Sequence, residues 1–121
     1  MQSQKQQTEA RRQRLQQQLR ALCSAPLMRG TISEVRRSCG RKNCACAKDP
    51  AARHPRKFLT VYLDGRTQGV HLRVDDLERV EQAVAAYNEL WKIVNELTAC
   101  EVADLRREAR ERRRGRKRRQ Q

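Results

Sequence analysis

Three cysteines close together, Cys39, Cys44 and Cys46, are followed eight residues later by His54, and this group constrains the chain more than any other feature. Structural zinc sites are commonly built from three thiolates and one imidazole arranged as a tetrahedron. A glycine directly after Cys39 permits a sharp turn that points backbone amides at the sulfurs. We therefore predict that Cys39, Cys44, Cys46 and His54 bind a structural Zn²⁺ ion, with His71 as an alternative fourth ligand.

The spacing differs from the common pair of Cys-x2-Cys knuckles, and two other interpretations stay open. Basic neighbours lower thiol pKa values, so the cysteines could be redox-reactive, or they could fill gaps without binding a metal. Cys23 and Cys100 lie far from the cluster in two predicted helices, where we expect them to pack.

Aromatic residues are only 3% of the 121 residues, so the hydrophobic core must be small. A bound metal would add stability that this core cannot supply. No apolar run approaches the length of a membrane span, and the first residues lack an apolar secretory core. We therefore predict a cytoplasmic protein with reduced thiols and no membrane partner, associated with the nucleoid if it binds DNA.

The elements that we predict give an α+β fold. Residues 5–23 are rich in helix formers and contain a narrow apolar stripe of Leu15, Leu19 and Leu22, and Pro26 ends this helix. Residues 58–74 are expected to form a β-hairpin around an Asp64-Gly65 turn, with residues 30–36 as a possible third strand. Because a lone hairpin is barely stable, the sheet needs other elements to cover it.

A long helix is predicted to follow, capped by Asp75 or Asp76, with Glu78 completing an approximate capping box. Its apolar residues recur at the three-four spacing of a coiled-coil seam: Leu77, Val80, Val84, Tyr87, Trp91 and Val94. We expect Tyr87 and Trp91 to face a core rather than to stack on bases. The predicted segments are a basic helix at 1–28, a zinc-binding β domain at 29–74, an acidic helix at 75–105 and an Arg-rich tail at 106–121.

The first helix is basic and the long helix is acidic, so the two could pair antiparallel, within one chain or between two chains. Such a pair would place three arginines of the first helix near three glutamates of the second: Arg11, Arg14 and Arg20 against Glu81, Glu89 and Glu96. Surface ion pairs add little energy but select partners. A homodimer through the seam at residues 77–97 is a further possibility.

Several short motifs resemble those of a family of small bacterial and phage proteins. They are Arg29-Gly30-Thr31-Ile32-Ser33-Glu34, the knuckle Cys39-Gly40-Arg41-Lys42-Asn43-Cys44-Ala45-Cys46-Ala47, His54-Pro55 and Gly65-Arg66-Thr67. The resemblance covers about residues 15–100 and concerns a domain of unknown function that occurs near transposases and other mobile elements. It implies a fold, a metal set and a setting, but no activity. The chain departs from the family pattern after His54, where Pro55-Arg56-Lys57-Phe58 replaces Gly-Pro and an aromatic pair.

The net charge of +14 makes a nucleic acid the expected partner. We predict a zinc-binding accessory protein that holds double-stranded DNA beside a transposase or recombinase. Few aromatic residues argue against a surface that stacks single strands. The mobile-element setting that the resemblance implies favours double-stranded DNA over RNA. The residues expected to contact phosphates lie around the metal loop and in a disordered tail: Arg36, Arg37, Arg41, Lys42, Arg53, Arg56, Lys57, Arg106, Arg107, Arg110, Arg112, Arg113, Arg114, Arg116, Lys117, Arg118 and Arg119.

No catalytic constellation is visible, so we do not expect an enzyme. Two other functions are weighed against nucleic-acid binding. A coiled-coil adaptor would use the long helix to recruit a protein partner, and an RNA-binding protein would use the Arg-rich tail, since such segments can fold on RNA.

Overall fold

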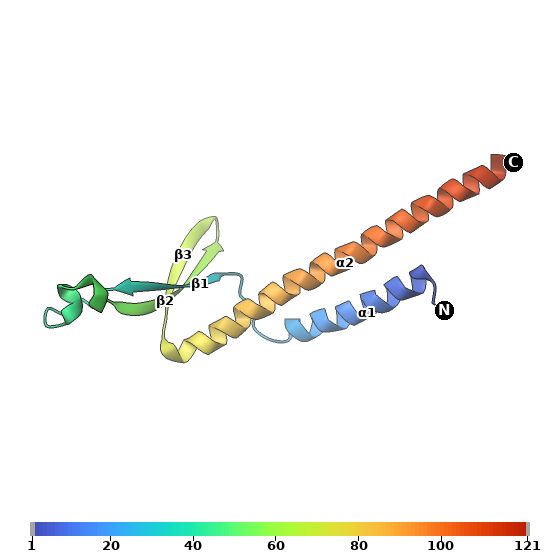
Figure 1. Ribbon diagram of the computed structural model, residues 1–121. Helices are drawn as coiled ribbons and strands as arrows, with labels where there is room; N and C mark the ends of the chain where they lie inside the picture. The colour runs from blue at the N-terminus through green and yellow to red at the C-terminus, as the bar shows by residue number, and fades with distance from the viewer. Residues whose placement is uncertain (1, 121) are drawn as a thin grey trace. The chain divides into compact units, whose positions relative to one another are not determined.

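The structure, a computed structural model, describes residues 2–120 and has the predicted α+β composition (Figure 1). A three-stranded antiparallel sheet lies between an N-terminal helix and a long C-terminal helix in the sequence. The elements are α1 (Gln4–Cys23), β1 (Thr31–Arg37), the short 3-10 helices η1 (Ala45–Ala47) and η2 (Pro50–Ala52), β2 (His54–Leu63), β3 (Arg66–Leu72) and α2 (Val74–Gln120). Met1 and Gln121, the outermost residues of the first and last predicted segments, lie outside the described residues.

The chain forms two compact units, and α2 contributes to both. One unit contains the residues up to Pro26 together with those from Asn88 onward. The other unit is the continuous segment Leu27–Tyr87, which holds the sheet and the first part of α2. None of the helices among residues 2–120 is long and apolar enough to cross a membrane.

Helix α1 begins at a capping box. The Ser3 side chain accepts a hydrogen bond from the backbone of Gln6, and the Gln6 side chain accepts one from the backbone of Ser3. The reciprocal bonds satisfy two amides that would otherwise lack partners at the helix start. The helix ends at Cys23, before Pro26, as the sequence predicts.

In the first unit, α1 packs antiparallel against the second part of α2, within one chain. Leu15, Ile93 and Cys100 form the buried cluster, and three leucines complete it at its margins: Leu19, Leu22 and Leu97. The predicted leucine stripe of α1 is therefore the face that α2 covers. Burial of this stripe stabilises a helix that would be marginal on its own.

The structure has ion pairs between these helices, but they do not involve the predicted residues. The arginine that bridges them is Arg12, which donates to Glu101 at 2.9 Å and to Asp104, and also pairs with Glu9 within α1. Arg12 precedes Leu15 by three positions and therefore shares its face of the helix. Among residues 2–120, Arg11, Arg14 and Arg20 form no ion pair and lie exposed.

In the second unit, β2 is the central strand of the sheet. The hairpin turn is Asp64-Gly65, with φ values of 54° and 76°, as the sequence predicts. Strand β2 begins at His54, earlier than the predicted residue 58, because its pairing with β1 continues to the Arg37–His54 pair. Pro55 is tolerated there, since β3 pairs with β2 only from Lys57 onward and needs no amide from Pro55.

One face of the sheet packs against the first part of α2. Leu59, Leu72 and Val80 are the buried residues, and partly buried apolar side chains surround them: Met28, Ile32, Val61, Leu77 and Val84. The backbone amide of Met28 donates to the carbonyl of Ala83 at 3.1 Å, which fixes the segment before β1 to the helix. The helix therefore supplies the cover that the sheet requires.

Helix α2 differs from the prediction at both ends. It begins at Val74, so Asp75 and Asp76 lie in its first turn, where their charges favour the helix dipole, rather than at the cap. It continues to Gln120, which contradicts the disordered tail expected beyond Gly115. Arginine is a good helix former, and the Arg107–Glu111 ion pair spans one turn of the helix. Basic residues in the last turns also interact favourably with the helix dipole. A single glycine therefore does not end the helix.

The seam predicted along α2 is only partly buried. Leu77, Val80 and Val84 pack against the sheet, but Trp91 is 57% exposed and Val94 is 37% exposed. The expectation that Trp91 faces a core is therefore wrong. Helix α1 covers the neighbouring face at Ile93, Leu97 and Cys100, and one narrow helix cannot cover both faces.

Candidate metal centre

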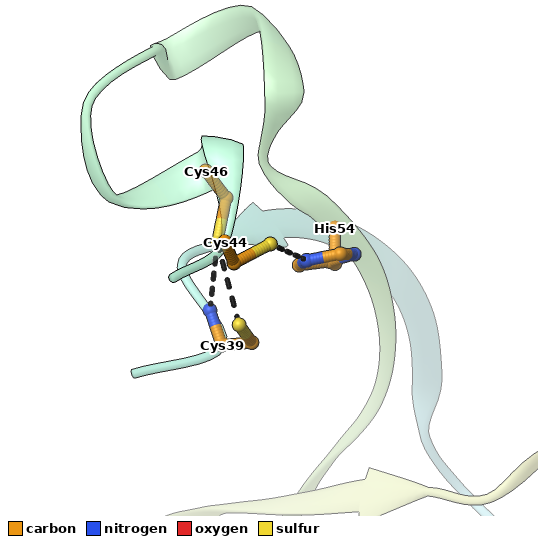
Figure 2. A group of neighbouring side chains, drawn as sticks. All are labelled: Cys39, Cys44, Cys46 and His54. Carbon is orange, nitrogen blue, oxygen red and sulfur yellow. Dashed lines mark hydrogen bonds between the residues drawn. The ribbon is translucent and has the colours of Figure 1, made fainter. Parts of the chain in front are cut away.

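The four predicted metal ligands come together where β1 ends and β2 begins (Figure 2). Cys39 follows β1 by two residues, Cys44 precedes η1, Cys46 lies within η1, and His54 is the first residue of β2. The last pair of the β1–β2 ladder joins Arg37 to His54, so the sheet itself holds the two ends of the loop together. When the two strands pair, the His54 imidazole therefore lies next to the thiols of the three cysteines in the loop.

The ligand atoms are close enough to share one ion. All four lie within 4.8 Å of one another. Cys39 Sγ and Cys46 Sγ are 3.5 Å apart, and Cys44 Sγ is 3.2 Å from His54 Nε2, which points at it. Zinc–sulfur bonds of about 2.3 Å in a tetrahedron place two sulfurs about 3.8 Å apart. The cluster therefore fits a tetrahedral ion of this size with small adjustments.

The hydrogen bonds around Cys46 favour its thiolate form. A bond from the backbone amide of Cys39 at 3.3 Å, together with the Ser38 hydroxyl at 3.7 Å, lowers the pKa of Cys46 to about 6 despite its burial. A hydrogen bond from the Cys46 amide lowers the pKa of Cys44. Bonds to the Cys46 and Cys39 thiols, together with burial, raise it by more, so the pKa of Cys44 lies above its ordinary value. A thiolate is the form that binds a metal.

Local backbone features hold the loop in this shape. Gly40 adopts a φ of 81°, a left-handed conformation that side chains disfavour, and it turns the chain directly after Cys39. Asp49 caps η2 by accepting a hydrogen bond from the Ala51 amide at 3.0 Å. The only acid between residues 36 and 57 thus has a structural role.

His71 is not a member of the cluster. It lies on β3, where its ring contacts the Phe58 ring edge-on at a centroid distance of 5.4 Å. His54 is therefore the imidazole that joins the three cysteines.

The other two cysteines behave differently from each other. Cys100 is buried between α1 and α2 as predicted, whereas Cys23 is exposed at the end of α1, so its predicted packing role is wrong. Cys23 follows Leu22 directly, and consecutive helical positions face different directions.

Basic side chains surround the cluster. We call residues 36–57 the metal head; it contains eight basic residues and one acid. A surface hollow of about 480 Å³ joins three of the ligands to polar neighbours, and its lining is Cys39, Cys44, His54, Arg41, Asn43 and Arg56. Asn43, which lines this hollow, and Ser38, whose hydroxyl lies 3.7 Å from Cys46 Sγ, were not among the predicted site residues, although each is directly beside a cysteine in the sequence.

The predicted phosphate contacts fall into two groups. Those of the metal head are exposed, except for Lys57, which is half-buried: Arg36, Arg37, Arg41, Lys42, Arg53, Arg56 and Lys57. Those of the C-terminal segment lie along the last turns of α2, and all but one are exposed. The exception is Arg107, which pairs with Asp104 at 2.7 Å and with Glu111 at 3.6 Å. Its charge is therefore used within the helix pair.

No curated protein and no solved structure shows significant similarity to the chain. A family model does match, and it spans residues 5–82, which include all of α1 but its first residue, the whole sheet, the metal head and the start of α2. This range covers more than half of the sequence and contains all four residues of the metal cluster. The chain therefore belongs to the family described as a domain of unknown function (DUF6788).

Proposed function

We propose that this protein is a zinc-stabilised nucleic-acid-binding protein whose metal head holds the phosphate backbone of DNA. The observation that carries the proposal is the charge around the cluster. Seven of the eight basic side chains of the head are exposed, and among residues 2–120 none of its basic residues forms an ion pair with an acid. Unpaired exposed cations suit contacts with a polyanion.

Zinc is the ion that the donor set favours, since three sulfurs and one imidazole nitrogen in a closed tetrahedron are typical of structural zinc sites. Cys39, Cys44, Cys46 and His54 would hold it, and it would clamp the loop onto the ends of β1 and β2. Four protein ligands leave no open position for a substrate. The proposed role of the metal is therefore structural, and the protein is proposed not to be an enzyme.

The C-terminal part of α2 supplies a second basic surface. Ten of the residues 106–119 are basic and two are acidic, and the helical conformation spreads them around the helix. Such a surface contacts phosphates without reading bases, because phosphates carry no sequence information. The proposed binding is therefore largely electrostatic, salt-dependent and independent of sequence.

The accessory role beside a transposase or recombinase is proposed from the motif resemblance and not from geometry. The same resemblance favours duplex DNA over RNA. A basic protein of this kind would hold DNA while a partner performs the chemistry.

The test is a salt series of duplex DNA binding by the full-length chain prepared with zinc. The variant replaces Arg41, Lys42 and Arg53 of the metal head with glutamine. Each lost phosphate contact should reduce the slope of log affinity against log salt by about 0.9. The matched control replaces Arg11, Arg14 and Arg20 of α1 with glutamine; these residues are also exposed and carry the same total charge. Equal losses in both variants would mean that net charge alone drives binding and would refute the role of the head.

An interaction function is the second candidate, and one observation favours it. Trp91, Val94 and Leu105 are exposed on α2 at spacings that place them on one face of the helix. A homodimer through the whole seam at 77–97 is disfavoured, because Leu77, Val80 and Val84 already pack on the sheet. Sedimentation of the wild type and of Trp91→Glu tests the remaining face; a monomeric wild type would exclude the dimer.

A further inference from the structure

The two faces of the sheet have different chemistry. Side chains alternate along a strand, so the register assigns every residue to one face. The face against α2 carries the apolar residues Ile32, Leu59 and Leu72, and it also carries Glu34, the only acid within the three strands, opposite Lys57. The opposite face, which we call the outer face, has no cover from α2.

The outer face contains no acid and gathers aromatic and basic residues. Its members on β1 are Thr31, Ser33, Val35 and Arg37; on β2 they are His54, Arg56, Phe58, Thr60 and Tyr62; on β3 they are Thr67, Gly69 and His71. All of them are exposed except His54 and Phe58, which are half-buried. Two of the four aromatic residues of the chain, Phe58 and Tyr62, therefore lie on one open surface.

Phe58 is at the centre of an ordered group on this face. The guanidinium of Arg37 lies over the Phe58 ring at 4.7 Å from its centroid, and His71 contacts the same ring edge-on. These contacts hold the planar groups in place before any ligand binds, which reduces the entropy lost on binding. The outer plane of a guanidinium is itself a stacking surface for a base.

Tyr62 extends the group along β2. It lies four residues beyond Phe58 on the same face, about 13 Å away along the strand, and is 65% exposed. Its cross-strand partner is Thr67, and Thr60 between the two aromatics faces Gly69, which has no side chain. An added Cβ at Gly69 would meet no atom within 4 Å. The surface between the two aromatic rings is therefore open.

We propose that the outer face binds a single-stranded nucleic acid, with unpaired bases stacked on Tyr62 and on the Arg37–Phe58 pair and with phosphates near Arg56. Aromatic residues on the exposed face of a sheet stack two or three bases in known single-strand readers. Bases inside a duplex are already stacked on one another, so a duplex cannot use these rings. The absence of acids among these outer-face residues suits a polyanion. This inference rests on the proposed nucleic-acid function and adds a second form of ligand to it.

The test measures binding of the full-length, zinc-loaded chain to labelled oligothymidylate and oligouridylate of about 15 nucleotides, and to a DNA duplex. Tyr62→Leu keeps an apolar side chain and removes the ring, while Tyr62→Phe keeps the ring. We expect Tyr62→Leu to weaken single-strand binding about 5- to 100-fold, the loss of one stacked base, and to leave duplex binding unchanged. Tyr62→Phe should restore single-strand affinity to near the wild-type value.

Leu63→Ala is the matched control, because Leu63 is the next residue of β2, is 54% exposed and lies on the other face of the sheet. It should leave single-strand binding unchanged. Ultraviolet cross-linking to oligothymidylate containing 4-thiothymidine, followed by peptide mapping, should locate the adduct in β2.

Two results would overturn the inference in distinguishable ways. If the duplex binds but Tyr62→Leu leaves single-strand affinity unchanged, or the adduct lies outside the sheet, the outer face is not a stacking surface and the proposed function survives. If neither the single strands nor the duplex binds, the proposed function fails as well.

Discussion

Arg12 in α1 donates a hydrogen bond to the carboxylate of Asp104 in α2, ninety-two positions later in the chain. The same carboxylate accepts a bond from Arg107 at 2.7 Å, so two guanidinium groups share one acid between the helices. This arrangement connects the helix pair of the first unit to a measurable pH dependence.

Bonds from Arg107 and Arg12 hold the pKa of Asp104 below its ordinary value. A carboxylate with a lowered folded-state pKa stabilises the fold above its unfolded pKa of about 3.9. That stabilisation is lost as the pH falls through the lower, folded value. We expect Asp104→Asn to be less stable than the wild type at pH 6, with the difference shrinking below about pH 4.

The measurement is urea unfolding between pH 2 and pH 6, followed by the fluorescence of the single tryptophan, Trp91, in the same unit. Glu89→Gln is the control, because Glu89 is exposed and its contact with Lys92 is long, at 4.0 Å. A difference between wild type and Asp104→Asn that stays constant with pH would contradict the assignment.

The metal prediction concerns Cys46, the buried member of the cluster. Cys46→Ser should lose the bound ion, and the second unit should then lose its fixed loop, because metal binding and folding are coupled in small sites. Elemental analysis should find one zinc per wild-type chain and much less in the variant. Cys23→Ser is the control, since Cys23 is exposed and outside the cluster.

X-ray absorption at the zinc edge should report three sulfur neighbours and one nitrogen neighbour. A wild-type chain that carries no metal after growth and purification with zinc would refute the site, and His54→Ala with unchanged metal content would refute the fourth ligand.

Gly30 lies immediately before β1, against the centre of the sheet. A Cβ at this position would lie 2.8 Å from Leu59 Cδ1 and 3.0 Å from the carbonyl oxygen of Thr60. The backbone oxygen cannot move freely, so we expect Gly30→Ala to lower the free energy of unfolding by about 1–3 kcal/mol. Thermal unfolding of Gly69→Ala provides the comparison, because the added methyl group there meets open space and should be neutral or slightly stabilising.

Leu15 is the buried residue of α1 in the helix pair, at 5% exposure. Leu15→Ala should lower the free energy of unfolding by about 2–4 kcal/mol, through lost burial and the cavity that remains. Far-ultraviolet circular dichroism during urea unfolding measures this loss. Leu105→Ala removes the same atoms from a side chain that is 62% exposed, and it should cost far less. Similar losses for both variants would mean that α1 does not pack on α2 in solution.

Local chemistry was sufficient to predict several parts of this fold. The Asp64-Gly65 pair predicts its turn because both positions need positive φ values, which these residues tolerate. The leucine stripe of α1 and the stop before Pro26 follow from helical periodicity and from the restriction that proline places on the preceding residues. The metal cluster follows from spacing, because the fourteen residues between Cys39 and His54 form a loop that brings the ligands together once its ends pair.

Other features depended on which surfaces meet. Periodicity places Trp91 on an apolar stripe with Val84, but only the packing shows that the sheet and α1 cover neighbouring parts of α2 and leave Trp91 exposed. Charge complementarity predicted a helix pair, but the register of the leucines selected Arg12 as its bridging arginine.

The outer face shows the same division. Strand alternation by itself places Phe58 and Tyr62 on one side of β2. Strand alternation does not predict which face of the sheet α2 covers, and it does not predict that Arg37 and His71 contact the Phe58 ring. The tertiary structure decided both, because the apolar residues Leu59 and Leu72 had to be buried against the helix, and this left the aromatic and basic residues facing outward.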